Sequence, residues 1–580
     1  MVKPAPRRRV TVSELRSQRW FARDDMRGFA HRQRMLQMGL RRDDFMGRPV
    51  IAIVNTWSDM SPCHAHLRER AAAVRAGVTR AGGLAVELPA LSLGEVMVKP
   101  TTMLYRNLLA LETEELIRSH PIDGAVLMGG CDKTTPGLLL GAISMDLPAI
   151  FLPAGPMLNG HWRGETVGAG THTRRYWDEL RAGKITKADW VDFEVRATRS
   201  VGTCNTMGTA STMTSMVEAM GMTLPGASSI PAADSGHTRM AAACGERIVG
   251  MVLEDLRPSE ILTEAAFRNA VTTAVALGGS TNAVIHLTAM ARRLGFACGN
   301  EAFDSEARRT PIVADLAPAG KFLMEDFFHA GGLPALLLRL SDRLDLDCMT
   351  VTGSSLGENI AGAKCWNADV IRPLDRPVTD QPAFAALTGN LAPNGAIIKP
   401  STASQHLQRH VGPALVFDSH RDMSARIDDP DLEVTPATVL VLRGSGPIGG
   451  PGMPEWGALP IPRKLLKEGT RDMVRISDAR MSGTHFGTCI LHVAPESHVG
   501  GPLALIRTGD RVSLDVAARA LNVELSADEL ARRRAAWQPP PPRFPRGYGA
   551  LVERHIGQAD TGCDFDFLEG TVRLPEPDIY

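Results

Sequence analysis

The chain has 580 residues, and its 64 Lys and Arg side chains balance 64 Asp and Glu, so it carries no formal net charge at pH 7. A neutral chain lacks the basic excess with which proteins bind nucleic acids or anionic membranes. No apolar run approaches the roughly 20 residues of a membrane-spanning helix, which predicts a soluble protein without a membrane partner. The length predicts at least two domains.

Nine cysteines are scattered along the chain, and no two of them form a CxxC pair. Because nothing in the sequence indicates secretion, we expect free thiols in the reducing cytoplasm. The basic start Arg7-Arg8-Arg9 lacks the apolar segment of a secretion signal and predicts a frayed terminus.

Apolar runs alternate with amphipathic helix patterns through the first third of the chain. Strands are predicted at Val50–Val54, Leu84–Leu88, Gly124–Met128 and Ala149–Leu152, with helices between them. Strands that alternate with helices are typical of a parallel sheet in an α/β domain.

Chemically reactive side chains follow these predicted strands. Cys63 follows the first strand, Glu95 the second and Cys131-Asp132-Lys133 the third. Ligands of open α/β sheets bind beyond the carboxyl ends of the strands, so these side chains could converge on one site. A thiol beside a carboxylate suggests ligands for two different kinds of metal centre. Three reactive side chains in a glycine-rich turn favour function over packing.

The segment Cys63-His64-Ala65-His66 also suggests a zinc site. Its spacing matches no common zinc motif, so solvated or capping histidines are the favoured interpretation.

The middle of the chain predicts two further helices. One extends from Cys204 to about Gly221, and its dipole would favour a thiolate at Cys204. The other begins near Ser280 and runs through Leu294. A proline-bearing, irregular segment from Arg372 to Gly389 follows.

The last third changes character to short β-like runs between glycine and proline turns. The runs are Ala396–Ile398, Ala414–Phe417, Thr438–Leu442, Met473–Ile476 and Arg511–Leu514. They predict a smaller β-rich domain that resembles a barrel. The expected fold is therefore a large N-terminal α/β domain with a parallel sheet, residues 1–384, and a C-terminal β-barrel-like domain, residues 385–580.

Two polar turns of the last third carry further candidates. The glycine-rich loop Gly444–Glu455 matches no phosphate-binding motif, and Glu455 could offer a hard oxygen ligand. Ser482 lies in the turn Ser477–Thr484, where taken alone it is a turn residue rather than a nucleophile. Spacing does not connect Cys63, Cys131 and Cys204, because no iron–sulfur motif has such separations.

Several motifs together resemble the dihydroxyacid/6-phosphogluconate dehydratase family over nearly the whole chain. These motifs are Asn55-Thr56-Trp57 with Pro62-Cys63, Ser92–Glu95 with Lys99–Met103, Gly130–Pro136, Gly202–Ala210, Gly449–Glu455 and Ser477–Thr484. The likeness is strongest to the dehydratases of aldonic acids, in particular pentonates such as L-arabinonate and D-xylonate.

The resemblance implies a hydro-lyase with two metal groups and a homodimeric or homotetrameric assembly. An iron–sulfur cluster, [2Fe-2S], would be bound by Cys63, Cys131 and Cys204. Mg²⁺ would be bound by Glu95, Asp132, Glu455 and a carbamylated Lys133. Ser482 would be the base that removes the C2 proton, with Thr484 close to the substrate.

Local differences favour a sugar acid over the branched-chain dihydroxy acids as substrate. Glu95 and Thr134-Thr135 differ from the Asp and Asn-Met associated with that branch, and the polar segment Asn159–Glu165 resembles the pentonate enzymes. The Lys of Cys-Asp-Lys disfavours the phosphogluconate branch. The chain ends in Tyr580 where related sugar-acid enzymes end in His, which leaves the role of the tail open.

Three alternatives remain beside an aldonic acid dehydratase that forms a 2-keto-3-deoxy acid. The first is a dihydroxyacid dehydratase of branched-chain amino acid biosynthesis. The second is a metal-binding sensor without catalysis, and the third is a structural protein whose buried cysteines are inert.

Overall fold

The structure is a computed structural model that describes residues 9–570 and 573–579. The predicted frayed residues Arg7 and Arg8 and the C-terminal Tyr580 lie outside the described residues.

The N-terminal domain is built on a four-stranded sheet with the order β2-β1-β3-β4 and all neighbours parallel. The strands are β1 (Val50–Asn55), β2 (Leu84–Pro89), β3 (Gly124–Gly129) and β4 (Ala149–Pro153). This confirms the four predicted strands and the parallel sheet. Every residue of β1, β3 and β4 is buried, as expected for strands covered by helices on both faces.

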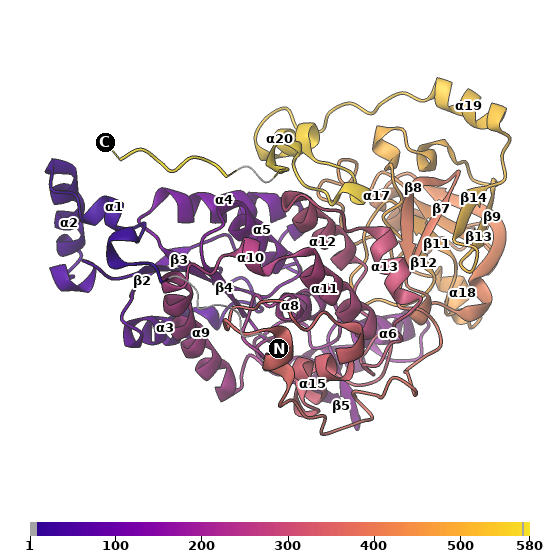
Figure 1. Cartoon of the computed structure of the whole chain (residues 1–580). Helices are drawn as coiled ribbons and strands as arrows, with labels where there is room; N and C mark the ends of the chain where they lie inside the picture. The colour runs from indigo at the N-terminus through magenta and orange to yellow at the C-terminus, as the bar shows by residue number, and fades with distance from the viewer. Residues whose placement is uncertain (1–8, 571–572, 580) are drawn as a thin grey trace.

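Helices cover both faces of this sheet (Figure 1). Helices α3 (Leu67–Arg80) and α9 (Ser235–Leu253) pack on one face, while α4 (Arg106–Ser119) and α5 (Thr134–Met145) pack on the other. The apolar side chains of α3 recur at helical spacing, so that one stripe is buried against the sheet.

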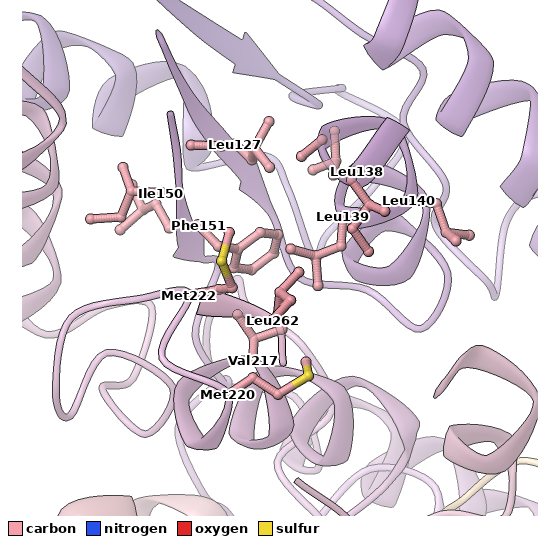
Figure 2. Close-up of a cluster of buried hydrophobic side chains, with 14 of the residues drawn as sticks. Leu127, Leu138, Leu139, Leu140, Ile150, Phe151, Val217, Met220, Met222 and Leu262 are labelled. Atoms are coloured by element: carbon pink, nitrogen blue, oxygen red, sulfur yellow. The ribbon is translucent and has the colours of Figure 1, made fainter. Parts of the chain in front are cut away.

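The core of the domain continues beyond the sheet into α8 (Thr209–Ala219), whose residues are all buried. Figure 2 shows where these layers meet: Leu127 of β3 and Phe151 of β4 face Leu139 of α5, and Val217 of α8 approaches from below. A helix that is buried on all sides needs little amphipathic pattern, because every face meets protein.

Further elements surround these layers. The helices are α1 (Gln18–Phe21), α2 (Met26–Gln37), α6 (Thr171–Arg181), α7 (Lys187–Arg196), α10 (Pro258–Ile261), α11 (Glu264–Ala276), α12 (Asn282–Arg293), α13 (Asn300–Ala307), α14 (Met324–His329), α15 (Gly332–Arg339) and α16 (Leu356–Ile360). A two-stranded antiparallel ribbon consists of β5 (Gly160–Trp162) and β6 (Glu165–Val167).

The C-terminal domain is an eight-stranded sheet curled into a nearly closed barrel, as the sequence predicts (Figure 1). In the order of the sheet the strands are β12 (Cys489–Ile490), β11 (Arg475–Ser477), β10 (Val439–Leu442), β9 (Arg409–Phe417), β13 (Arg511–Asp515), β14 (Ala520–Val523), β7 (Ala385–Gly389) and β8 (Ala392–Ile398). Ile397 and Leu491 exchange two backbone hydrogen bonds of 2.9 Å, which join the ends of the sheet. Closure leaves fewer unpaired backbone groups at the edges.

Two predictions from the sequence are wrong in detail. The helix predicted from Cys204 begins only at Thr209, and Cys204 lies in an extended segment beside Pro156 and Thr203, which form a β-bridge. Tertiary pairing with residues after β4 therefore overrides the helical pattern. The segment predicted as irregular from Arg372 to Gly389 ends in strand β7, because β8 and β14 supply backbone partners for it.

Within the barrel, α17 (His420–Arg426) connects β9 to β10, and α18 (Arg463–Lys467) connects β10 to β11. After β14 the chain leaves the barrel through α19 (Ala527–Ala536) and α20 (Tyr548–His555) and returns over the first domain (Figure 1). Arg293 of α12 forms a bidentate ion pair with Asp564, with both side chains 1% exposed. Arg16 pairs with Glu576 near the end of the chain, so the C-terminal segment spans both domains.

All nine cysteines are free. Among the described helices, none is both long and apolar enough for a bilayer.

We expect Arg293→Met to lower the free energy of unfolding by about 3 to 5 kcal/mol, because Asp564 would keep a buried charge without its partner. The matched control is Arg292→Met, which removes the neighbouring bidentate pair with Glu569, whose side chain is 34% exposed. The control substitution should lower the free energy of unfolding by less than about 1 kcal/mol. Urea unfolding of both variants measures the difference, and equal losses would contradict a larger stabilising role for the buried Arg293–Asp564 pair.

Candidate active site

The predicted site residues follow the carboxyl ends of strands from both domains. Cys63 follows β1, Glu95 follows β2, and Cys131-Asp132-Lys133 follows β3 directly. In the barrel, Glu455 lies in the loop after β10, and the turn that carries Ser482 and Thr484 follows β11. The structure brings residues of the two domains into contact, because Glu455 reaches Lys133.

The three cysteines that spacing could not connect are neighbours in space. The Cys63 thiol makes a hydrogen bond with Cys131 and lies within electrostatic range of Cys204. A backbone hydrogen bond of 3.0 Å from Gly202 to the carbonyl of Pro62 holds the two outer loops together. Three thiols from three separate loops thus share one side of the site.

Lys133 lies at the centre of the opposite side and is fully buried. Its Nζ is 3.3 Å from Glu95 Oε2, 3.2 Å from Asp132 Oδ2 and 3.2 Å from Glu455 Oε1. Three carboxylates from three loops therefore surround one ammonium group, and these loops belong to both domains.

The electrostatic balance of this cluster follows from burial and close charges. Burial and Arg480 oppose the charge of Lys133, but the surrounding carboxylates outweigh them and raise its pKa. Burial raises the pKa of Asp132, with Glu455 and Glu95 adding to the effect. Burial alone would also raise the pKa of Glu455, but Lys133 and Arg480 together lower it.

The thiols respond to the same environment. The hydrogen bond with Cys131, followed by burial, raises the pKa of Cys63 well above its usual value. Burial, and then the charges of Asp132 and Cys131, raise the pKa of Cys204. The expectation that a helix dipole would favour a thiolate at Cys204 is therefore wrong, since Cys204 precedes the helix and is desolvated.

Two residues that the sequence analysis did not assign to the site hold Glu455 in place. Arg480 is fully buried and contacts Glu455 Oε1 at 3.0 Å and Thr101 Oγ1 at 3.0 Å. Asn282, the first residue of α12, places its Nδ2 3.0 Å from Glu455 Oε1 and 3.1 Å from the carbonyl of Met481. Arg480 lies within the motif Ser477–Thr484 and Asn282 lies at the start of a predicted helix, but no local pattern showed which carboxylate they would meet.

Ser482 and Thr484 form a hydroxyl pair beside this cluster. Their side-chain oxygens are 2.9 Å apart, and the Thr484 backbone N–H donates to Ser482 Oγ at 3.4 Å. Gly483 between them has no room for a side chain, because a Cβ there would lie 2.7 Å from the backbone nitrogen of Thr209. The close approach of this turn to α8 and Ser280 fixes the position of both hydroxyls.

The histidines next to Cys63 are buried, so their interpretation as solvated residues is wrong, while His66 does occupy the N-cap position of α3 without a capping hydrogen bond from its side chain. His64 Nε2 accepts a hydrogen bond of 3.2 Å from the backbone N–H of Cys131, and its Nδ1 lies 2.9 Å from Ser92 Oγ. His66 Nε2 lies 2.7 Å from the carbonyl oxygen of Ala154. Burial lowers the pKa of His64 to about 3, so this imidazole is neutral and supports the Cys131 loop.

In the part of the chain that the structure describes, no three His, Cys, Asp or Glu side chains are arranged to hold a metal ion as they stand. The carboxylates close on the Lys133 ammonium instead. The donor types nevertheless suit two metal groups, with thiols for a soft centre and carboxylates for a hard one. If Lys133 became an anionic ligand, the carboxylates would face one another around a negative group and would require a cation.

Glu455 also lines a cavity of about 300 Å³ that extends away from Lys133. Arg174 and Trp177 of α6 and His420 and Trp456 of the barrel contribute to its walls. A larger cavity of about 660 Å³ lies elsewhere, lined by residues such as Glu114, Arg293 and Phe567, and none of the predicted site residues lines it. The converging reactive groups, rather than the cavity size, locate the candidate site.

Comparison with known proteins identifies matches over most of the chain. Residues 48–359 match the family model described as dihydroxy-acid/6-phosphogluconate dehydratase N-terminal, and residues 369–563 match the C-terminal counterpart.

Three relatives illustrate the range of similarity. A 6-deoxy-6-sulfo-D-gluconate dehydratase of Pseudomonas putida is 60% identical, and the match covers 98% of this chain and 99% of that protein. An L-arabinonate dehydratase of Rhizobium leguminosarum bv. trifolii is 50% identical over 96% of both chains. A dihydroxy-acid dehydratase of Caldanaerobacter subterraneus subsp. tengcongensis is 39% identical over 92% of this chain and 97% of that protein.

We expect Gly170→Ala to lower turnover by roughly a hundredfold, because small displacements of reactive groups have effects of this size. A Cβ at Gly170 would lie 2.4 Å from Thr484 Oγ1 and would push this hydroxyl away from Ser482. Gly164→Ala is the matched control, since its φ is also +82° but nothing lies within 4 Å of the added Cβ. Steady-state rates of the two variants make the test, and similar losses in both would show that backbone strain alone is responsible.

Proposed function

Because the chain belongs to the dihydroxy-acid/6-phosphogluconate dehydratase family and is a hydro-lyase, we propose that it removes water from an aldonic acid and releases a 2-keto-3-deoxy acid. The observation that carries this proposal is the contact of Glu455 with Lys133, which joins the carboxylate cluster of one domain to the loop of the other. The relatives named for sugar acids support an aldonic acid above the alternative, a branched-chain dihydroxy acid.

We propose that Cys63, Cys131 and Cys204 hold an iron–sulfur cluster of the [2Fe-2S] type. Glu95, Asp132, Glu455 and a carbamylated Lys133 would hold Mg²⁺. The proximity of the three thiols and the convergence of the carboxylates support these two ligand sets. When bound, the two groups would supply Lewis acids that stabilise negative charge on the oxygen atoms of the substrate.

The chain's own residues suit the removal of a proton next to a carboxylate. In the proposed reaction Ser482 Oγ takes the proton from C2, and the C2–H electron pair forms the double bond to C3 as the C3 hydroxyl leaves. The proton and the hydroxyl together make up the released water, and the enol becomes the 2-keto-3-deoxy acid by tautomerisation. The Thr484 hydroxyl and backbone N–H both lie close to Ser482 Oγ and can stabilise the alkoxide form that a serine base requires.

The aldonic acids that this enzyme could accept differ in chain length and in the group at the far end. The sequence favours a pentonate such as L-arabinonate or D-xylonate, while a relative at 60% identity is named for a six-carbon acid with a sulfonate. A substrate panel therefore contains both pentonates, gluconate, 6-deoxy-6-sulfogluconate and 2,3-dihydroxyisovalerate.

With cluster-loaded enzyme, we expect the kcat/KM of the best aldonic acid to exceed that of 2,3-dihydroxyisovalerate by at least about a hundredfold. A site built to bind several hydroxyls leaves polar groups unpaired when a branched aliphatic acid enters. Formation of the 2-keto acid measures the rates, and Ser482→Ala should lower kcat roughly a thousandfold as the loss of a general base. Exclusive turnover of the dihydroxy acid would refute the proposed substrate class.

For the cofactors, we expect replacement of Cys63, Cys131 or Cys204 by Ser to abolish the visible absorbance that iron and sulfide produce on anaerobic reconstitution. Cys365→Ser is the matched control, because Cys365 is partly exposed like Cys63 and Cys204 but lies away from the site. It should keep the absorbance of the unaltered protein. Retention of the chromophore in all three site variants would contradict the cluster assignment. Full turnover by enzyme from which Mg²⁺ has been removed, without added Mg²⁺, would contradict the magnesium assignment.

A further inference from the structure

Arg174 of α6 is an arginine without a carboxylate partner in the cavity beside the candidate site. Within residues 9–570 and 573–579, its one side-chain hydrogen bond runs from Nε to His485 Nε2, and no carboxylate oxygen lies within 4.0 Å of its guanidinium. The terminal nitrogens of Arg174 have no acceptor among these residues. The group is partly buried and lines the cavity of about 300 Å³ together with Glu455.

The neighbouring arginines differ from Arg174 because they are paired. Arg181, on the same helix and the same cavity, binds Asp428 at 2.6 Å. Arg475 binds Asp472 at 2.7 Å. Arg471 is exposed, lines an adjoining cavity and donates to the carbonyls of Leu466 and Thr470 rather than to a carboxylate. Arg174 therefore brings to this cavity a positive charge without a directly bound carboxylate, and the carboxylates of Asp178 and Glu455 act on it only from a greater distance.

His485 orients this charge. Its imidazole is buried, and burial together with the charges of Arg174 and Arg475 keeps its pKa well below the usual value. A neutral imidazole can accept the hydrogen bond from Arg174 Nε, which leaves the two terminal amino groups of the guanidinium for another acceptor. Burial lowers the pKa of Arg174, but the ordinary pKa of arginine lies so far above neutral pH that the guanidinium stays charged.

The distance from Arg174 to the reacting groups is set by α6. Thr171 Oγ1, in the first turn of α6, donates to the carbonyl oxygen of Thr484 at 2.7 Å. Arg174 follows three residues later and therefore lies about one helical turn, roughly 5 Å, along the axis. A sugar acid with C2 and C3 at the Ser482–Thr484 pair can direct the far end of its chain toward Arg174.

We propose that Arg174 binds a singly charged anionic group, a sulfonate, at the end of the sugar acid opposite the C1 carboxylate. This inference rests on the proposed aldonic acid dehydration and assigns a specificity-determining residue to it. One unpaired guanidinium matches one negative charge, and its fork of N–H groups suits an oxyanion. A phosphate carries close to two charges at neutral pH and would leave one of them unpaired in a partly buried cavity.

The test compares 6-deoxy-6-sulfogluconate with gluconate, which has the same carbon chain and a neutral C6 hydroxyl. The unaltered enzyme should show a kcat/KM for the sulfonate at least about a hundredfold above that for gluconate. Arg174→Gln should remove this preference, mostly through a higher KM for the sulfonate, so that the ratio of kcat/KM for the sulfonate to that for gluconate falls from about a hundredfold to about one. Arg174→Lys should retain part of the preference, because it keeps the charge.

Arg175→Gln is the matched control on the same helix. Arg175 is more exposed than Arg174 and pairs with Glu165, so its replacement should leave the ratio of kcat/KM for the two substrates unchanged. Thermal unfolding of all variants shows whether they fold. If Arg174→Gln fails to fold, the change in preference of Arg174→Lys decides the question.

Three results would overturn the inference while aldonic acid dehydration itself stands. They are turnover of gluconate or pentonates without any preference for the sulfonate, equal losses on both substrates in Arg174→Gln, and a higher kcat/KM for 6-phosphogluconate or for the terminal dicarboxylate glucarate than for the sulfonate. If no aldonic acid reacts with cluster-loaded enzyme, the proposed function fails. In that case calorimetry still tests Arg174 separately. Binding of 6-deoxy-6-sulfogluconate to the unaltered protein and its loss in Arg174→Gln would support the inference, and no binding to the unaltered protein would overturn it.

Discussion

The ammonium group of Lys133 is the buried charge that carboxylates from both domains surround. Burying a cation in a protein interior is costly unless opposite charges surround it, and here the loops after β2, β3 and β10 each supply a carboxylate. The contact with Glu455 links positions 322 residues apart in the chain. The barrel must therefore dock with its loops facing the carboxyl ends of the parallel strands, which is the arrangement that creates the site.

A second layer of buried polar groups makes that docking specific. Arg480 binds both Glu455 and Thr101, and Asn282 binds Glu455 and the backbone beside Ser482. Asp478 joins the loops after β10 and β11, because it accepts hydrogen bonds from the backbone of Ser445 and the side chain of Ser497. A buried hydrogen bond that is left unmade is costly, so these contacts exclude other docking angles more strongly than apolar contacts would, although Asn282 Oδ1 itself has no partner among the described residues.

The site separates a rigid reaction centre from a more open cavity. The thiols, carboxylates and hydroxyl pair lie among buried loops, whereas Arg174 and the aromatic residues of α6 and the barrel line a space that reaches toward the surface. Chemistry common to the family can then remain constant while the cavity selects the far end of the substrate. This division is the physical basis on which Arg174 acts as a specificity residue in our proposal.

The sequence by itself determined the local elements and the residue types of the site. The apolar runs of β1, β3 and β4 predict buried parallel strands because such strands are covered on both faces, and reactive residues directly follow them. Tertiary structure alone decided the start of α8 after Cys204, the pairing of β7, the partners of Arg480 and Asn282, and the lack of a carboxylate for Arg174. The physical reason is that apolar periodicity and turn residues are visible among neighbours in sequence, whereas strand pairing and the balance of buried charge depend on residues far away in the chain.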